Sequence, residues 1–204
     1  GGLSHAEGYN TIASGIYSHA EGQSTTASGD SSHAEGAVTV AGGSYSHAEG
    51  ASTIASGIYS HAEGYNTKAS ENYSHAEGNG ALASGDTSHA EGYFTVAGGD
   101  YSHAEGNNTT ASGDNSHAGG LSSQALSTNS FAHGNTNIVT GLNSVAIGGN
   151  NLTNNTANSV MVPNLTVDGD FSGGTGGGVI YSGGTDLYDI FTSVDLWSAS
   201  TGVR

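Results

Sequence analysis

Histidine and glutamate recur as a pair in the phrase Ser-His-Ala-Glu-Gly, which begins at Ser4 and returns every fourteen residues, in eight copies, up to Ser102. Imidazole and carboxylate side chains form general acid–base pairs, metal sites and hydrogen-bonded networks. His5 and Glu7 are two residues apart, so on an extended strand they point to the same side, about 6.6 Å from each other. Their chemistry therefore depends on how successive copies are placed.

Stacking of the copies would form one column of histidines beside one column of glutamates. In three further, degenerate copies the columns fade through Gly119 and His133 and end in an apolar pair. We call these outward residues the ladder, and its members are His5, Glu7, His19, Glu21, His33, Glu35, His47, Glu49, His61, Glu63, His75, Glu77, His89, Glu91, His103, Glu105, Val145 and Ile147. Carboxylates about 4.8 Å apart repel by roughly 1 kcal/mol per pair in water and by more when partly buried. Neighbouring imidazoles would relieve this repulsion by donating hydrogen bonds or by taking up protons.

Three interpretations of the ladder are open: a network between subunits, a solvated outer face, and metal binding. Histidine and carboxylate groups are competent metal ligands, but an unbroken ladder contains no distinct closed site. Eight identical copies without a pocket favour a structural role over acid–base catalysis. No esterase, Walker, zinc-protease or dinucleotide motif occurs in a suitable context. We therefore predict no catalytic residue, no metal ligand, no cofactor and no enzyme activity.

Each fourteen-residue period divides into two half-repeats of the form Ser/Thr-x-Ala-x-Gly-x-x, as in residues 4–10 and 11–17. Alternation within each half is the period of a β-strand, which predicts two short strands per coil joined by two-residue turns. The inward residues are serine, alanine and threonine, so we expect a flattened roll whose two sheets nearly touch. Eleven coils of parallel strands would span about 50 Å.

Glycines mark both turns of the coil, as at Gly8 and Gly15. A chain that reverses direction every seven residues needs backbone conformations that glycine adopts cheaply. Glu71 and Ser127 interrupt the second glycine series, so we expect local irregularity at those two corners.

We assign residues 1–157 to the repeat domain and 158–204 to a connector. The connector has an extended segment at Val160–Val167 and a glycine-rich link at Gly173–Gly178. Leu187, Ile190, Val194 and Trp197 then follow a heptad-like spacing, which fits either a short coiled coil or a single packed helix.

The composition excludes several classes of partner. The chain has 18 acidic and two basic residues and a net charge of −16, so it has no basic face for nucleic acid or an anionic membrane. No stretch approaches the roughly 20 apolar residues of a membrane span. Such a composition is otherwise typical of disorder, but a fixed repeat allows small residues to stack into a thin core. Because a thin core stabilises a monomer weakly, we expect oligomerisation.

Aromatic residues concentrate at the corners of the predicted coil. Tyr9, Tyr65, Tyr93 and Phe94 fall at the first turn, and Tyr17, Tyr45, Tyr59, Tyr73 and Tyr101 fall at the second. Exposed aromatics at regular spacing would stack on sugar rings or contact a protein receptor, and we mark them as candidate binding residues. The alternative is that they pack between subunits or cover neighbouring corners.

The tandem Ser-x-Ala-x-Gly-x-x scheme, and Ser-Val-Ala-Ile-Gly-Gly-Asn at Ser144 above all, resembles the head repeats of YadA-like trimeric autotransporter adhesins. Similar repeats occur in bacteriophage tail fibres. The resemblance covers residues 4–157 and implies a left-handed parallel β-roll, a homotrimer, and continuation into a stalk. It also implies that the face bearing Val145 and Ile147 meets the neighbouring subunit. The ladder would then be a polar subunit interface that becomes apolar in the last coil.

We therefore predict an all-β, homotrimeric, left-handed parallel β-roll with a short C-terminal connector. Its function would be that of a structural and adhesive module of a phage tail or receptor-binding fibre, located on the virion. The partners would be other copies of the chain, other fibre segments and a host-cell surface receptor, glycan or protein. The chain begins with Gly1, which we interpret as a processed product or part of a longer protein. Two alternatives are the head of a bacterial surface adhesin and a self-assembling extracellular filament with unprotected strand edges.

Overall fold

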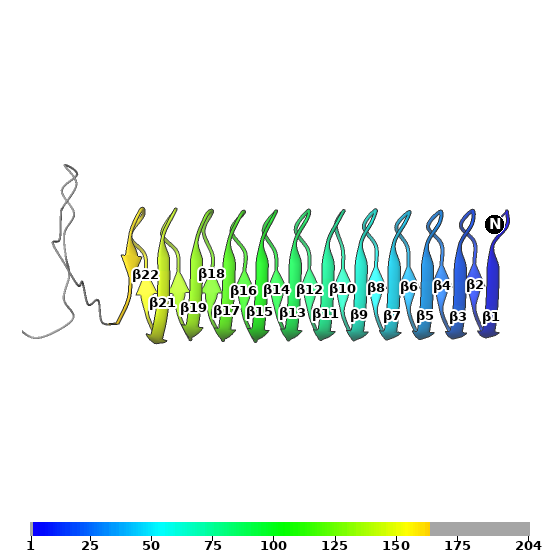
Figure 1. The fold of residues 1–204 in the computed structure, drawn as a ribbon, viewed down its shortest axis with the longest axis horizontal. Coiled ribbons are helices and arrows are strands. Elements are labelled where there is room, and N and C mark those ends of the chain that lie inside the picture. Colours follow the sequence, from blue (N-terminus) through cyan, green and yellow to red (C-terminus); the bar gives the residue numbers. More distant parts are fainter. Residues whose placement is uncertain (1, 164–204) are drawn as a thin grey trace, which may run out of the picture. The chain divides into compact units, whose positions relative to one another are not determined.

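The structure is a computed structural model that describes residues 2–163. The glycine-rich link, the heptad-like spacing and the second half of the predicted extended segment (164–167) lie outside the described residues. Within residues 2–163 every regular element is a strand, and the coils follow one another in a single row, from blue at β1 to yellow at β22 (Figure 1). The described part of the chain contains no helix that could cross a membrane.

The first sheet contains the long strand of each coil, and neighbouring strands in it are parallel. Its strands are β1 (His5–Tyr9), β3 (His19–Gln23), β5 (His33–Ala37), β7 (His47–Ala51), β9 (His61–Tyr65), β11 (His75–Asn79), β13 (His89–Tyr93), β15 (His103–Asn107), β17 (His117–Leu121), β19 (Phe131–Asn135), β21 (Val145–Asn150) and β23 (Val160–Met161).

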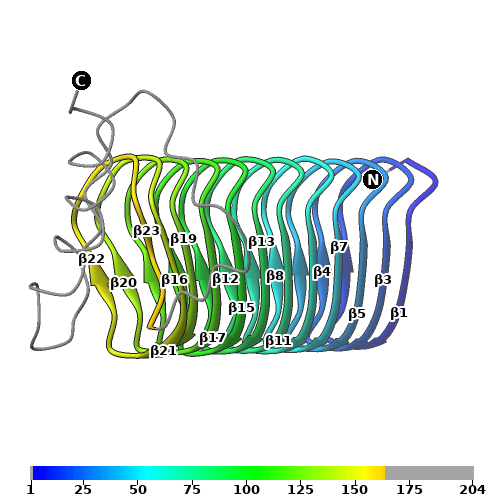
Figure 2. The same ribbon diagram turned by 60° about the vertical axis from the view of Figure 1, so that its left-hand side comes forward.

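The second sheet contains the short strand of each coil in the same order. Its strands are β2 (Ile12–Ala13), β4 (Thr26–Ala27), β6 (Val40–Ala41), β8 (Ile54–Ala55), β10 (Lys68–Ala69), β12 (Leu82–Ala83), β14 (Val96–Ala97), β16 (Thr110–Ala111), β18 (Gln124–Ala125), β20 (Ile138–Val139) and β22 (Thr153–Asn154). Successive coils lie in register along the row (Figure 2). The predicted all-β parallel roll of fourteen-residue coils is confirmed.

The register places each residue beside its own equivalent in the next coil. His5 pairs with His19, and Glu7 pairs with Glu21. The same relation repeats from β9 to β11, where His61 pairs with His75. Because parallel pairing with a constant period stacks identical side chains, the roll converts a sequence repeat into columns.

The core between the sheets is made of small side chains. Alanines such as Ala20 and Ala27 are completely buried, and serines and threonines such as Ser18 and Thr25 are almost completely buried. The largest fully buried side chain in the described residues is that of Val139. The predicted flattened roll with a thin core is confirmed, and it explains why alanine is needed: a larger residue would separate two sheets in close contact.

The two glycine series differ in backbone conformation but share a close approach to the next coil. A β-carbon on Gly8 would lie 2.1 Å from the carbonyl oxygen of Gly22. Gly8 has a φ of 121°, so the predicted special conformation is confirmed for the first series. Gly15 does not have a positive φ, so in its series close approach acts alone: a β-carbon there would lie 2.0 Å from the carbonyl oxygen of Gly29. In the second corner the left-handed conformation falls on non-glycine residues such as Tyr17, with a φ of 59°. The cause that we predicted for this second series is therefore wrong.

The irregularity expected at Glu71 and Ser127 is absent from the corner hydrogen bonds. The Ser74 amide donates to the Glu71 carbonyl at 3.3 Å, as the Ser60 amide donates to the Gly57 carbonyl at 3.3 Å. The equivalent bond to the Ser127 carbonyl measures 3.2 Å. The corner hydrogen bond is therefore retained where glutamate or serine replaces glycine.

The real irregularity lies in the eleventh coil, which has one extra residue. Val145 pairs with Val160, fifteen positions later, and the pairing of β19 with β21 shifts between His133 and Asn135. Gly148 and Gly149 take positive φ values of 71° and 64°, as expected of a bulge. Parallel strand pairing continues through β23 to Met161, beyond residue 157, where we predicted the repeat domain to end.

Candidate functional site: the histidine and glutamate ladder

The ladder occupies the outer face of the first sheet. In β9, Ala62 is fully buried while His61 and Glu63 on either side of it are partly exposed, and this alternation repeats along the sheet. Val145 and Ile147 continue the same two columns, since they pair with Phe131 and His133. The fold thus brings all the predicted ladder residues to one face.

The histidine rings form a continuous stack. From His5 to His103, successive ring centroids are 4.7–5.0 Å apart and the ring planes differ by at most 9°. The stack breaks at His117, whose ring lies at 79° to that of His103. The His117 ring stacks instead on Phe131, at 4.7 Å and 14°. The orientation of the imidazole therefore changes where the sequence repeat degenerates.

Contacts between the histidine and glutamate columns are close but incompletely hydrogen-bonded. His75 Nε2 lies 3.6 Å from Glu63 Oε1 of the preceding coil, and His103 Nε2 lies 3.3 Å from Glu91 Oε1. Several Nε2 atoms have almost no solvent access and no hydrogen-bond partner within the described chain: those of His19, His33, His47, His61, His75, His89 and His117. The face therefore has unused hydrogen-bonding capacity at atoms that solvent does not reach.

The electrostatics keep the central imidazoles neutral near neutral pH. Burial lowers the pKa of His75 and of His89, and the charge of the next histidine in the column lowers each pKa further. The pKa of Glu91 is also lowered, first by its hydrogen bond with Glu77 and then by the charge of His89. The lowered histidine pKa values thus oppose proton uptake by the imidazoles. We had expected such uptake to reduce the repulsion between neighbouring glutamates.

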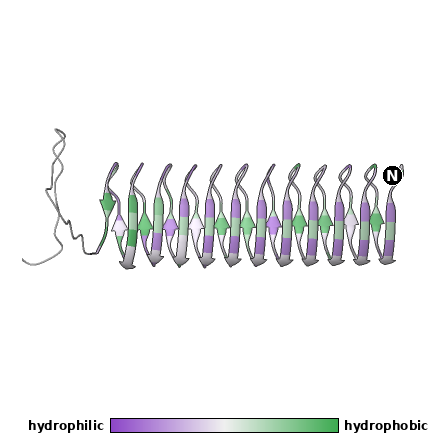
Figure 3. Cartoon of the chain, viewed as in Figure 1, coloured by the Kyte–Doolittle hydropathy of each residue, from purple (hydrophilic) through white to green (hydrophobic). Residues whose placement is uncertain are grey.

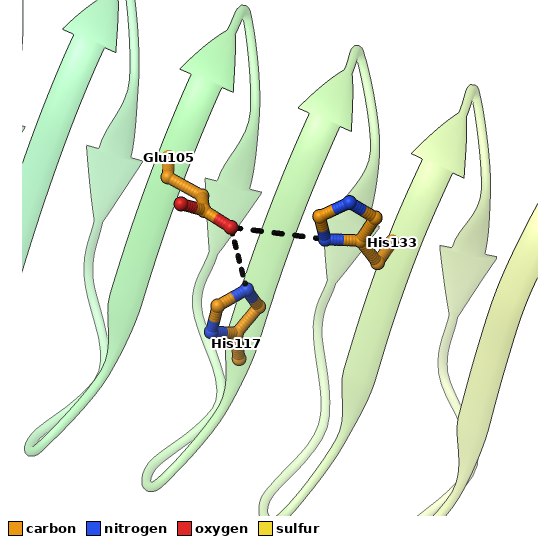
Figure 4. A group of neighbouring side chains, drawn as sticks. All are labelled: Glu105, His117 and His133. Atoms are coloured by element: carbon orange, nitrogen blue, oxygen red, sulfur yellow. Dashed lines mark ion pairs between the residues drawn. The ribbon is translucent and has the colours of Figure 1, made fainter.

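Three side chains converge where the ladder breaks. We call Glu105, His117 and His133 the junction cluster, and they project from β15, β17 and β19 (Figure 4). Glu105 Oε1 lies 3.4 Å from His117 Nε2 and 3.8 Å from His133 Nδ1. Burial lowers the pKa of His117, as does the charge of His103. Two imidazoles and one carboxylate from three consecutive coils thus face one another.

Gly119 makes this convergence possible. It occupies the glutamate column between Glu105 and His133, and a β-carbon on it would lie 2.4 Å from His133 Nδ1 and 3.0 Å from Glu105 Oε1. From the sequence we identified Gly119 and His133 only as the fading of the ladder. The sequence nevertheless contained a signal for this contact. Glu105, Gly119 and His133 are successive members of the glutamate column, and a glycine in the middle leaves a gap that the other two side chains face.

The family of the chain follows from its repeats. A family model described as the YadA head domain repeat matches residues 6–32, 76–102, 104–126, 125–151 and 140–160, which together make up more than half of the chain. The chain belongs to the YadA head repeat family. A comparison with curated proteins found no match. As a YadA head, the chain is an adhesin-like fibre module of the extracellular type, and the repeat and parallel roll predicted from its sequence are those of the family.

The corner aromatics of this YadA head are all exposed, as a receptor contact requires. Their exposed fractions range from 48% for Phe94 to 74% for Tyr9. Tyr45, Tyr59 and Tyr73 stack in consecutive coils, with centroids 4.8 and 5.3 Å apart. Tyr9, Tyr65 and Tyr93 are the last residues of their strands rather than turn residues, which corrects their predicted place. No finding tests their binding role, which stays a prediction.

The second sheet of the YadA head presents a more apolar outer face. The outward residues of its short strands include Val40, Ile54, Leu82 and Val96, all partly exposed, with Lys68 among them. In Figure 3 most of these short strands are green, which marks hydrophobic residues. The long strands carry alternating purple (hydrophilic) and green bands. We call this row the second-sheet stripe. It is a second surface that could meet another subunit.

Proposed function

We propose that this YadA head is a homotrimeric structural and adhesive module of a phage tail or receptor-binding fibre, located on the virion. Its partners would be two further copies of the chain, adjoining fibre segments and a receptor on the host-cell surface, either glycan or protein. Nucleic acid and membrane insertion have no part in this proposal, because the net charge is −16.

The observation that carries the proposal is the ladder face itself. A core of alanines and small polar residues buries little apolar area per coil, so the isolated roll has a weak hydrophobic contribution to stability. The same roll presents a row of aligned imidazoles with covered, unpartnered Nε2 atoms. Association through this face would bury the ladder, whose histidine and glutamate side chains are partly exposed along the sheet. Val145 and Ile147 would extend the contact as an apolar segment at the end of the roll.

The mass of the purified chain tests this proposal. Light scattering coupled to size exclusion is expected to give three times the 20.1 kDa of one chain, from pH 6 to pH 8. A monomeric mass throughout this range would refute the trimer. Negative-stain images are expected to show discrete rods of one length. Indefinite filaments would instead support the alternative of end-to-end assembly through the open strand edges.

Cross-linking identifies which face forms the interface. The chain has no cysteine, so a single introduced cysteine reports one position without background. Glu63→Cys lies in the ladder and Lys68→Cys lies in the second-sheet stripe of the same coil. Under a short bismaleimide linker, the Glu63 variant is expected to form covalent dimers in high yield and the Lys68 variant few. The reverse result would move the interface to the second-sheet stripe.

The head of a bacterial surface adhesin is the second candidate function. Membership of the YadA head family supports it, because the repeat is described by that name. Neighbouring genes that encode tail proteins would support the phage fibre, and an adjoining outer-membrane anchor would support the bacterial adhesin. Both functions use the same trimeric roll, so the mass and cross-linking experiments bear on either one.

A further inference from the structure

The junction cluster differs from the rest of the ladder in composition. Along the regular ladder, groups that could hold a metal ion combine one histidine with two glutamates, as in Glu49, His61 and Glu63. Successive groups share a glutamate, as the groups around His61 and His75 share Glu63. The cluster of Glu105, His117 and His133 instead supplies two imidazoles and one carboxylate. Two imidazoles and one carboxylate form a well-established donor set for zinc.

The distances within the junction cluster fit one small cation. Zinc binds nitrogen and oxygen at about 2.0–2.2 Å in tetrahedral sites, which places neighbouring ligand atoms roughly 3.3–3.5 Å apart. The distance from Glu105 Oε1 to His117 Nε2 is 3.4 Å, and the distance to His133 Nδ1 is 3.8 Å. All three ligand atoms lie within 4.8 Å of one another. Small side-chain rotations would therefore bring them onto one ion.

The surroundings orient His117 toward this point. Its ring is turned out of the histidine stack and rests on Phe131, which replaces histidine in that column. Its Nε2 atom is covered and makes no hydrogen bond, although it faces Glu105 (Figure 4). The ring is thus held in place with its free nitrogen directed at the other two ligands.

Gly119 supplies the space. A glutamate in this place, as in the eight regular copies, would fill the gap between Glu105 and His133. Gly119 has no side chain to occupy this gap. The three atoms nearest to the position of a β-carbon on Gly119, outside the adjoining residues, belong to His133 and Glu105. The break in the repeat therefore creates a local gap lined by metal ligands, which the unbroken ladder does not have.

We propose that Glu105, His117 and His133 form a binding site for one divalent transition-metal ion of the zinc type. His117 Nε2, His133 Nδ1 and the Glu105 carboxylate are the ligands, and water completes the tetrahedron. The ion joins three consecutive coils where the polar ladder ends, so its role is to stabilise the C-terminal part of the roll. This site replaces the sequence-based prediction of no metal ligand. It does not depend on the trimer, because one chain contributes all three ligands.

Zinc titration of the intact chain tests the site. The protein is freed of any polyhistidine tag, stripped with EDTA, dialysed and titrated with zinc sulfate by calorimetry. We expect one ion per chain and a rise in melting temperature on adding zinc. Cobalt(II) in place of zinc is expected to give the visible absorption bands of a tetrahedral site. Absence of saturable binding to the wild-type chain would overturn the proposal.

Matched variants separate the junction cluster from the rest of the ladder. His133→Gln and His117→Gln are expected to weaken zinc binding by at least ~10–100-fold. That range applies when a metal ligand loses only its hydrogen-bond partner, whereas these variants remove the ligand itself. His61→Gln removes a histidine from a regular group and is expected to leave the affinity and the single-ion stoichiometry unchanged. Circular dichroism in EDTA checks that every variant folds. Equal losses in all three variants, or several equivalent ions per chain, would show nonspecific binding by the ladder and refute the site.

Discussion

A β-carbon on Gly119 would lie 2.4 Å from Nδ1 of His133, in the next strand of the same sheet. The glycine is needed there because of this side chain, since its own φ is not in the left-handed region. Most other glycines of the long strands face a neighbouring backbone instead. One missing side chain thus brings together Glu105 and His133 of the junction cluster, which are two coils apart.

Substitution of Gly119 by alanine is expected to remove the effect of zinc at a small cost in stability. The new methyl group would displace the end of the flexible His133 side chain rather than backbone, so the fold adjusts but the ligand moves. The rise in melting temperature on adding zinc is the measurement. Gly42→Ala is the control, because a β-carbon there would lie 3.7 Å from the carbonyl oxygen of Ala55, an ordinary contact. An undiminished zinc effect in Gly119→Ala would contradict the proposed geometry.

Gly50→Ala is expected to lower the free energy of unfolding by about 1–3 kcal/mol or more. Gly50 has a φ of 105°, and a β-carbon would lie 2.2 Å from the carbonyl oxygen of Gly64, which cannot move without breaking the ladder. Gly42→Ala has room and a compatible backbone, so it should change stability by less than about 1 kcal/mol or stabilise the roll. Urea denaturation of both variants makes the comparison, and similar midpoints would refute it.

Acidification is expected to destabilise the roll. The folded-state pKa values of His61, His75 and His89 are lowered, so the unfolded chain binds protons first as pH falls. Stability from these histidines is complete above about pH 6.5 and is lost as pH falls from there toward their folded-state pKa values. The lowered pKa of Glu91 adds a loss of the same sign at lower pH.

Melting temperatures in EDTA between pH 8 and pH 5 measure this dependence. A triple variant with glutamine at positions 61, 75 and 89 is expected to give a flatter curve between pH 7 and pH 5. A wild-type melting temperature that rises on acidification through this range would show that pairing with glutamate outweighs burial, in accord with the sequence-based expectation.

Asn137→Ala is expected to loosen the eleventh coil. The buried Asn137 side chain donates to the carbonyls of His133 at 3.0 Å and Gly148 at 2.8 Å, and accepts from the Leu152 amide at 3.1 Å. Each buried group left without a partner costs about 1–3 kcal/mol. Hydrogen exchange should accelerate at Leu152 while the amide of Leu82, in the middle of the roll, stays protected. Uniform acceleration along the roll would indicate global unfolding instead.

Replacement of Tyr45, Tyr59 and Tyr73 by asparagine is expected to abolish receptor binding without loss of stability. These tyrosines adopt left-handed φ values near 60°, which asparagine tolerates better, and Asn115, Asn129 and Asn143 occupy the same corner in later coils. Binding of labelled protein to host cells and its melting temperature are the two measurements. Retained binding would exclude these corner tyrosines as the contact surface, and a large fall in melting temperature would assign them to packing.

The columns of the ladder were predictable because a constant period leaves a parallel strand little choice of register. Once alanine alternates with histidine and glutamate, the alanine must face the thin core and the charged residues must face outward. The pairing of His5 with His19 and of Glu7 with Glu21 follows directly. The two strands per coil and the fully buried Ala20 and Ala27 follow for the same reason.

The local repeat could not predict interactions that depend on the actual spacing of atoms between coils. Gly15 looked like a turn glycine, but it is required by the carbonyl of Gly29 in the next coil. The longer turn of the eleventh coil is bonded by the buried side chain of Asn137, which contacts Gly148 and Leu152.

The sequence by itself thus determined the roll, its register and the composition of its outer columns, since these depend only on period and alternation. Only the tertiary structure decided that burial outweighs the glutamates in setting the pKa of His75. It also decided that Glu105 and His133 meet across Gly119. Both outcomes depend on distances and solvent exclusion between coils, which exist only after the chain has stacked on itself.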